Sequence, residues 1–206
     1  MRADLYARIR CGGFTEGATA ALFYSDRSST LATLAHEGWH QYLGPRLTQP
    51  VPAWLNEGMA CYHESVEWSG VSPTFTPARN AFRINALREG VQAKRLMPLT
   101  EIIDTDAGEV IARRQPEVTQ VYYAQAWALV TFLWHGADGR YAKGLTRLLS
   151  DVADGTYRIQ AGTARLTAPG GNEVSLNAAA FESYFGVTPE AIEGEYHVFL
   201  LELAGF

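Results

Sequence analysis

Cysteine is scarce in this sequence: its 206 residues include two, Cys11 and Cys61. Two sulfurs without a CxxC pair exclude both a disulfide-stapled scaffold and a structural zinc knuckle. They leave open whether the two cysteines form one disulfide or remain thiols. Long apolar runs are also missing, because even stretches such as 126–134 are far shorter than the roughly 20 residues that span a bilayer. No transmembrane helix is therefore expected.

The sequence has few charged residues, and its net charge is slightly negative. Charged residues make up 19% of the chain, and 17 Lys and Arg against 22 Asp and Glu give a net charge of −5. Without a basic run the sequence predicts no nucleic-acid partner, because phosphate binding needs clustered Lys and Arg. Residues 1–10 carry charges throughout and lack the apolar core of a signal peptide. We expect either a cytoplasmic protein or a domain excised from a longer, cell-envelope or secreted precursor.

The spacing of apolar residues and of helix-stop signals predicts a mostly α (α+β) fold in a single domain, 1–206. A small β element (1–25), with one strand at 14–25, precedes a metal-binding helix pair (26–70) and a helical remainder (71–206). Residues 156–176 read as a loop or hairpin. The first expected helix starts after N-cap candidates at 26–30 and ends at Gly44. Further helices are expected at 52–68, 77–90, a short stretch after Pro98, 116–134, 139–153, 177–185 and 189–203.

The segment HEGWH (His36–His40) carries the first functional signal. Residues four apart lie one turn above each other on a helix, so both imidazoles project from the same face and can reach one metal ion. Glu37 is about 100° round the helix from His36 and can reach a water bound there. Two histidines, a carboxylate base and a zinc-activated water are the parts that metal-assisted hydrolysis requires.

A catalytic zinc ion needs a third protein ligand and an open position. Sixteen residues separate His40 from Glu57, and they include a Gly-Pro break and a Pro helix start, so a second helix can fold back on the first. Glu57 lies among Trp, Leu, Met and Ala, where a carboxylate is costly to bury unless it is paired or bound to metal. The alternative is a first-turn glutamate favoured by the helix dipole.

HEGWH followed by WLNEGMA (Trp54–Ala60) resembles the gluzincin metallopeptidases, whose signature is HExxH, a short turn and a helix bearing the glutamate ligand. The resemblance implies a zincin-like helical domain that binds Zn²⁺ through His36, His40 and Glu57. The helix pattern continues to Tyr62 and Glu64 as in the aminopeptidase N family, in which the position of Glu64 is an acid beside the ligands. Because Glu64 lies about 10 Å beyond Glu57 along the helix, it suits holding a ligand imidazole rather than sharing the ion.

A third match is the helix start Tyr123–Leu133, which resembles the segment whose tyrosine hydroxyl stabilises the oxyanion in these enzymes. The resemblance favours Tyr123 over Tyr122, and a core aromatic is the alternative. The remaining motifs look like those of bacterial peptidase-MA-like domains, here Pro77–Arg79, Met97–Leu99 and Phe185–Val187. The Gly-x-Met-Glu-Asn strand of the aminopeptidases is missing, so exopeptidase specificity does not carry over.

Together these features predict a zinc-dependent peptide-bond hydrolase with Glu37 as general base and a peptide or protein as substrate. The runner-up is a non-catalytic zincin-like module that binds a partner within a larger protein. A helical domain without metal is the third reading, and it requires both motifs to be coincidences. Cys61 is expected to be a packed thiol, and structural roles are expected for the other histidines: His63, His135 and His197.

Overall fold

The computed structural model describes residues 13–16, 19–47, 50–69, 71–105, 110, 116–157, 165–167 and 173–206. It is mostly helical, as the sequence predicts. The helices are α2 (Arg27–Leu43), α3 (Ala53–His63), α4 (Ala81–Gln92), α5 (Leu99–Asp104), α7 (Pro116–His135), α8 (Ala142–Ala153), α9 (Leu176–Phe185) and α10 (Pro189–Ala204), with short 3-10 turns η1 (Gly44–Arg46), η2 (Pro77–Arg79) and η3 (Ala137–Gly139).

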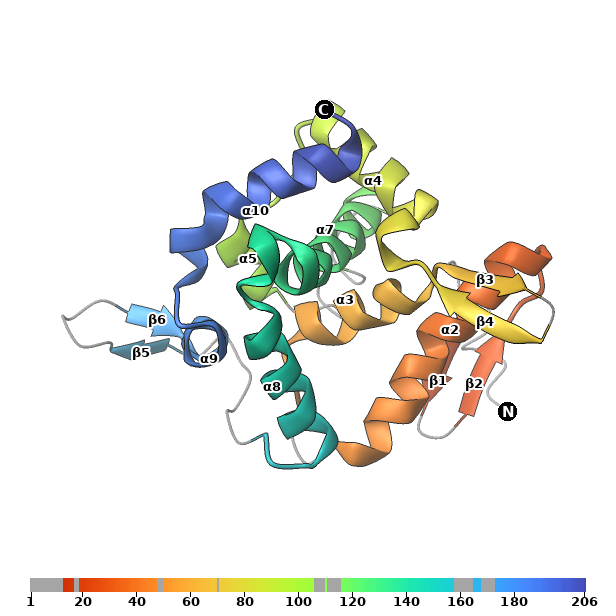
Figure 1. Cartoon of the computed structure of the whole chain (residues 1–206), viewed down its shortest axis with the longest axis horizontal. Helices are drawn as coiled ribbons and strands as arrows, with labels where there is room; N and C mark the ends of the chain where they lie inside the picture. Colours follow the sequence, from red (N-terminus) through yellow and green to blue (C-terminus); the bar gives the residue numbers. More distant parts are fainter. Residues whose placement is uncertain are drawn as a thin grey trace.

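Helix α7 is the centre of the core. Its residues from Ala124 to Leu133 are all buried, as expected for a helix that is apolar on every side. Helices α3, α4, α8 and α10 pack around it, and Figure 1 shows α7 in the middle of the helical body. Within the described residues, no helix is long and apolar enough to cross a membrane.

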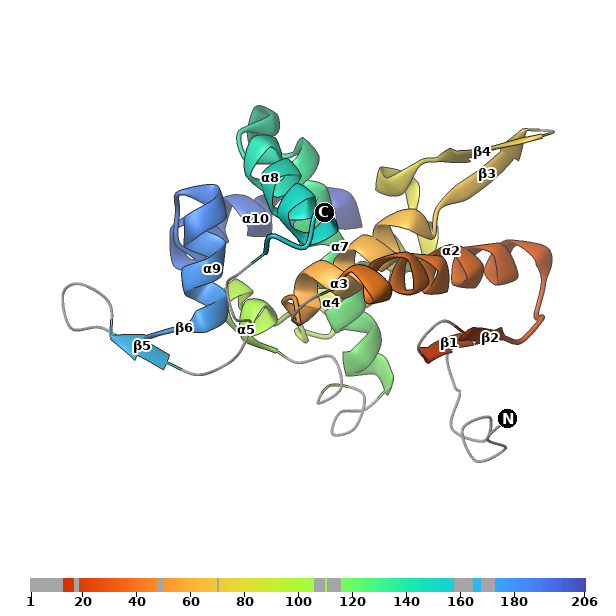
Figure 2. The same cartoon turned by 90° about the horizontal axis from the view of Figure 1, so that it is seen from below.

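The β structure of the described residues consists of three separate antiparallel hairpins. Figure 2 shows one of them, β5–β6, at the opposite end of the molecule from the other two. It lies within the region predicted to be a loop or hairpin. The strands are β1 (Gly13–Glu16) with β2 (Thr19–Leu22), β3 (Val66–Ser69) with β4 (Ser72–Phe75), and β5 (Arg165–Thr167) with β6 (Glu173–Ser175).

Three boundary predictions were wrong. The single strand expected at 14–25 is the β1–β2 hairpin. The second predicted metal-binding helix, α3, ends at His63 rather than near Trp68, because residues 66–69 form strand β3, which pairs with β4. In addition, α4 begins after Asn80, whose side chain accepts a hydrogen bond from the main-chain nitrogen of Arg83, and not directly after Thr76.

Helix starts with strong capping residues were predicted well. The Asp26 side chain caps α2 by accepting a hydrogen bond from the main-chain nitrogen of Ser29. Thr188 caps α10 in the same way, directly before Pro189. The cap at Asp26 therefore marks the start of α2, the helix that carries His36 and His40.

Candidate metal centre

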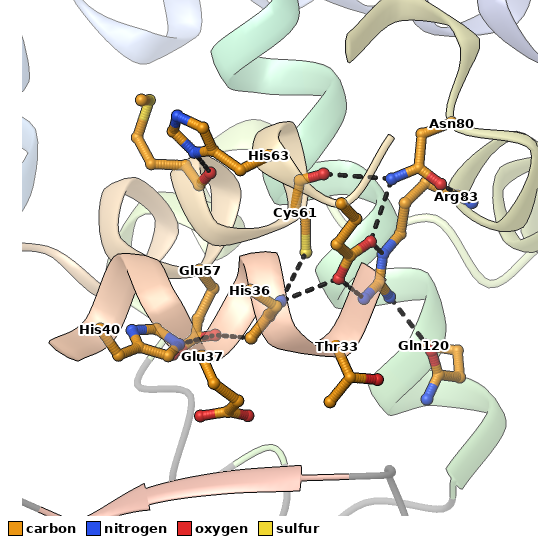
Figure 3. A network of polar contacts seen from close by, with 12 residues as sticks. Thr33, His36, Glu37, His40, Glu57, Cys61, His63, Asn80, Arg83 and Gln120 are labelled. Atoms are coloured by element: carbon orange, nitrogen blue, oxygen red, sulfur yellow. Dashed lines mark hydrogen bonds and ion pairs between the residues drawn. The ribbon is translucent and has the colours of Figure 1, made fainter. Parts of the chain in front are cut away.

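Helices α2 and α3 pack against each other and carry the three predicted metal ligands. His36 and His40 lie one turn apart on α2, with ring centroids 5.0 Å apart. Glu57 lies on α3, and its Oε2 is 3.5 Å from the Nε2 of His36 and 3.5 Å from the Nε2 of His40. Figure 3 shows the three side chains converging on one point between the helices.

The geometry of these three groups fits a zinc ion. Two ligand atoms about 2.1 Å from a tetrahedral centre lie about 3.4 Å from each other, close to both observed separations. Two imidazole nitrogens and a carboxylate oxygen are also a donor set of catalytic zinc. Although burial raises the pKa of the Glu57 carboxyl, hydrogen bonds and charge from His36 and His40 hold that pKa at about 2. Glu57 is therefore ionised and ready to act as a ligand.

The other nitrogen of each imidazole has its own partner. His36 Nδ1 lies 2.8 Å from Glu64 Oε1. His40 Nδ1 lies 3.2 Å from Asn56 Oδ1, which also accepts a hydrogen bond from Trp39 Nε1 at 3.2 Å. Because these oxygens are acceptors, each Nδ1 carries a proton, which leaves Nε2 as the nitrogen that faces Glu57 and that could bind a metal ion.

Glu64 is in turn held by residues of α4. Arg83 donates to Glu64 Oε1 at 2.6 Å and to Oε2 at 2.8 Å, and Asn80 Nδ2 donates to Oε2 at 3.0 Å. Burial raises the pKa of the Glu64 carboxyl, but the Arg83 charge and the contact with His36 hold it at about 2. Arg83 also donates to Gln120 of α7, so one guanidinium joins three helices behind His36, as Figure 3 shows.

Four residues of this network were not predicted from the sequence: Asn56, Asn80, Arg83 and Gln120. Asn56 stood inside the quoted WLNEGMA motif, directly before a ligand, and that adjacency was a usable signal. Asn80 and Arg83 carried none, because their role depends on how α4 packs against the end of α3. The expected contact of Glu64 with a ligand imidazole is present.

A cleft of about 1380 Å³ opens over the predicted ligands. His36, Glu37, His40 and Glu57 line it from the two metal helices, and Tyr123 lines it from α7. The side chain of Glu37 is only 7% exposed. Two carboxylates, two imidazoles and a phenol therefore face one space that is large enough for a peptide segment.

The two adjacent tyrosines of α7 have different surroundings. Tyr122 is fully buried, with its hydroxyl 3.4 Å from the main-chain oxygen of Thr105. Tyr123 lines the cleft, its ring centroid is 6.2 Å from that of His36, and the Arg83 guanidinium lies 5.4 Å from its centroid. Tyr123, and not Tyr122, therefore lies beside the predicted metal ligand His36.

Cys61 lies close to His36 but does not belong to the group formed by the three predicted ligands. Cys61 is a free, buried thiol whose Sγ is 4.0 Å from His36 Nδ1. His36, Cys61 and Glu64 also come close enough together to hold a metal ion, but Arg83 already places a positive charge on Glu64. Cys11, and with it the question of a disulfide to Cys61, lies outside the described residues.

Each of the other histidines has a structural setting. His63 Nδ1 lies 2.7 Å from the main-chain oxygen of Met59, and its ring stacks on Trp39. His135 Nε2 contacts the Tyr62 hydroxyl at 2.8 Å, and His197 is exposed on α10. None of the three belongs to a metal-binding cluster formed by described residues.

Comparison with known proteins gives a family. The profile of DUF1570, a family described as proteins of unknown function, matches residues 30–151. No curated protein and no solved structure matches the chain. The matched segment is more than half of the chain and includes most of α2, all of α3, the predicted ligands and Tyr123. The chain belongs to the DUF1570 family.

Proposed function

We propose that this protein is a zinc-dependent peptide hydrolase. The observation that carries the proposal is that Nε2 of His36 and Nε2 of His40 both lie 3.5 Å from Glu57 Oε2, while each Nδ1 faces its own acceptor. Such a site uses two nitrogens and one oxygen and leaves room for a water and a substrate. The same three residues stand in the gluzincin-like motifs of the sequence.

A zinc ion held by His36, His40 and Glu57 would acidify a water molecule and polarise a substrate carbonyl. Glu37 lines the same cleft, on the turn of α2 that also carries His36. Its carboxylate would accept a proton as the water oxygen attacks the carbonyl carbon. It would then return that proton to the amine nitrogen when the carbon–nitrogen bond breaks.

Tyr123 is proposed to assist as a neutral hydrogen-bond donor. It lines the cleft beside His36, and a phenol hydroxyl directed at developing negative charge stabilises that charge without adding a counter-ion. The cleft lining around these groups contains both apolar and charged side chains, which suits a peptide better than a strongly charged polymer.

The test is the substitution Glu37→Gln, with Glu89→Gln on the exposed side of α4 as the matched control. Zinc content and cleavage of a fluorogenic peptide library are measured for both variants and the unaltered protein. We expect Glu37→Gln to keep its zinc and to lose about 100-fold or more in rate, because it removes the general base. Zinc-loaded protein that cleaves nothing would contradict the proposal and favour the non-catalytic binding module.

A further inference from the structure

Strand β1 lies along α2, with Gly13 next to Thr33 and Thr15 next to Glu37. Gly13 and Thr15 are two residues apart and point to the same side of the strand, while Thr33 and Glu37 are one turn apart on α2. A Cβ on Gly13 would meet Thr33 Cγ2 at 2.7 Å, so a glycine is needed for this close approach. Figures 1 and 2 both show the β1–β2 hairpin beside α2.

This approach brings a hydroxyl onto the carboxylate of Glu37. Thr15 Oγ1 donates to Glu37 Oε2 at 2.6 Å, and its distance to the main-chain oxygen of Glu37 is longer, 3.3 Å. A separation of 2.6 Å lies in the range of charge-assisted hydrogen bonds from a hydroxyl to a carboxylate. Figure 3 shows the Glu37 side chain extending from α2 toward the strand beneath it.

The other carboxylate oxygen of Glu37, Oε1, accepts no hydrogen bond from Thr15. Of the residues that the structure describes, Thr15 is the one whose side chain donates to Glu37. Oε2 is therefore fixed while Oε1 is left to accept a proton from another group in the cleft. A carboxylate held at one oxygen loses rotational freedom about its last torsion, which favours a single reactive orientation.

We propose that Thr15 is a positioning residue for Glu37: its hydroxyl holds Oε2 so that Oε1 faces the attacking water. The inference rests on the proposed hydrolase function. The β1–β2 hairpin, which precedes α2 and α3 in the chain, would therefore contribute one residue to the site.

The variants are Thr15→Val, which keeps the shape and removes the hydroxyl, and Thr15→Ser, which keeps the hydroxyl. Thr19→Val is the matched control, because Thr19 is an exposed residue of the same hairpin, opposite Glu16. We expect Thr15→Val to lower kcat about tenfold at unchanged zinc content, with KM within about twofold. Thr15→Ser and Thr19→Val should stay within about threefold of the unaltered protein.

A second readout needs neither zinc nor substrate. In metal-free protein, Thr15→Val should lower Tm by about 4 °C, and this loss should disappear in a Glu37→Ala background. A loss of Tm in both backgrounds, or a Thr15→Ser variant as slow as Thr15→Val, would assign Thr15 to hairpin packing and overturn the inference.

The two proposals fail in different ways. If Glu37→Gln abolishes cleavage while Thr15→Val cleaves at the full rate, the hydrolase stands and the role of Thr15 falls. If the zinc-loaded, unaltered protein cleaves no peptide, both fall together.

Discussion

Arg83 of α4 donates hydrogen bonds to both carboxylate oxygens of Glu64, the residue after α3, at 2.6 and 2.8 Å. Glu64 follows α3 and contacts His36 Nδ1 at 2.8 Å, whereas Arg83 lies on α4. The orientation of one predicted metal ligand on α2 therefore depends on a cation on a different helix, α4. A bidentate pair of this kind fixes direction as well as distance.

Replacing Arg83 with Met should weaken both folding and zinc binding. The change leaves the buried Glu64 carboxylate without its counter-charge, which costs about 3–5 kcal/mol, and it frees His36 to rotate, which lowers metal affinity about 10–100-fold. Arg83→Lys keeps the positive charge but cannot donate two parallel hydrogen bonds to the carboxylate. This variant should fold and show a smaller loss of zinc affinity. Urea unfolding and competition with a zinc chelator measure the two effects.

The exposed Arg27 of α2 supplies the control for that experiment, because Arg27→Met is the same substitution at a residue that does not contact Glu64. A folded Arg83→Met protein that binds zinc as tightly as Arg27→Met would show that the Arg83–Glu64 pair does not orient His36.

Asn56 should support His40 in a comparable way. Its Oδ1 accepts from His40 Nδ1 and from Trp39 Nε1, both at 3.2 Å, so it fixes the ring and the tautomer together. We expect Asn56→Ala to weaken zinc binding about tenfold or more. Asn85→Ala, at an exposed position on α4, should leave it unchanged. Equal affinities in isothermal titration would refute this role.

Two glycines next to site residues predict opposite effects of the same substitution. A Cβ on Gly58 would meet Ala126 O at 2.5 Å, where α3 crosses α7, and a backbone atom cannot rotate away. Gly58→Ala should therefore lose about 1–3 kcal/mol of stability. Gly38 has no atom within 4 Å of an added Cβ, so Gly38→Ala should gain about 0.5–1 kcal/mol from helix propensity. Thermal unfolding that ranks Gly58→Ala at or above Gly38→Ala would contradict the packing of α3 on α7.

The protein should lose stability at alkaline pH through Tyr196. Burial raises the pKa of Tyr196, the nearby Glu193 raises it further, and the hydroxyl donates to Gln125 O at 2.8 Å. Because the folded pKa lies above the unfolded value of about 10, the contribution is complete below that pH. Above it the unfolded chain releases its proton first, and stability falls by about 1.4 kcal/mol per pH unit.

Tyr196→Phe should therefore flatten the dependence of unfolding free energy on pH above about pH 10, at a cost of about 1 kcal/mol at neutral pH. Urea unfolding at several pH values gives the slopes. Tyr157, whose pKa burial raises to about 12, contributes the same slope in both proteins. Identical slopes for the two proteins would mean that Tyr196 ionises as easily in the folded state as in the unfolded chain.

The parts of the site that were predictable from sequence are those set by local geometry. His36 and His40 are one turn apart on a single helix, so their common face follows from the helical period alone. Glu57 required one further step, a short turn that folds α3 onto α2, and Gly44-Pro45 and Pro52 signalled it. The helical fold follows from the same periodicity.

The parts that could not be predicted depend on packing between distant segments. Thr15 meets Glu37 across 22 residues and Arg83 meets Glu64 across 19, and neither pair has a characteristic spacing. The β3–β4 hairpin was missed because Val66 and Trp68 extend the apolar pattern of α3, although the chain changes from helix to strand after Glu64. Tertiary pairing, rather than local propensity, determines the structure there.

The proposed hydrolase requires that His36, His40 and Glu57 together hold one zinc ion. Anomalous diffraction at the zinc absorption edge, on crystals of protein purified without added metal, locates that ion. We expect one peak, about 2.0–2.2 Å from Nε2 of His36, Nε2 of His40 and a carboxylate oxygen of Glu57, that is lost in His40→Ala. If no such peak is present after zinc is supplied, or if the ion is bound elsewhere, these three residues do not form the zinc site.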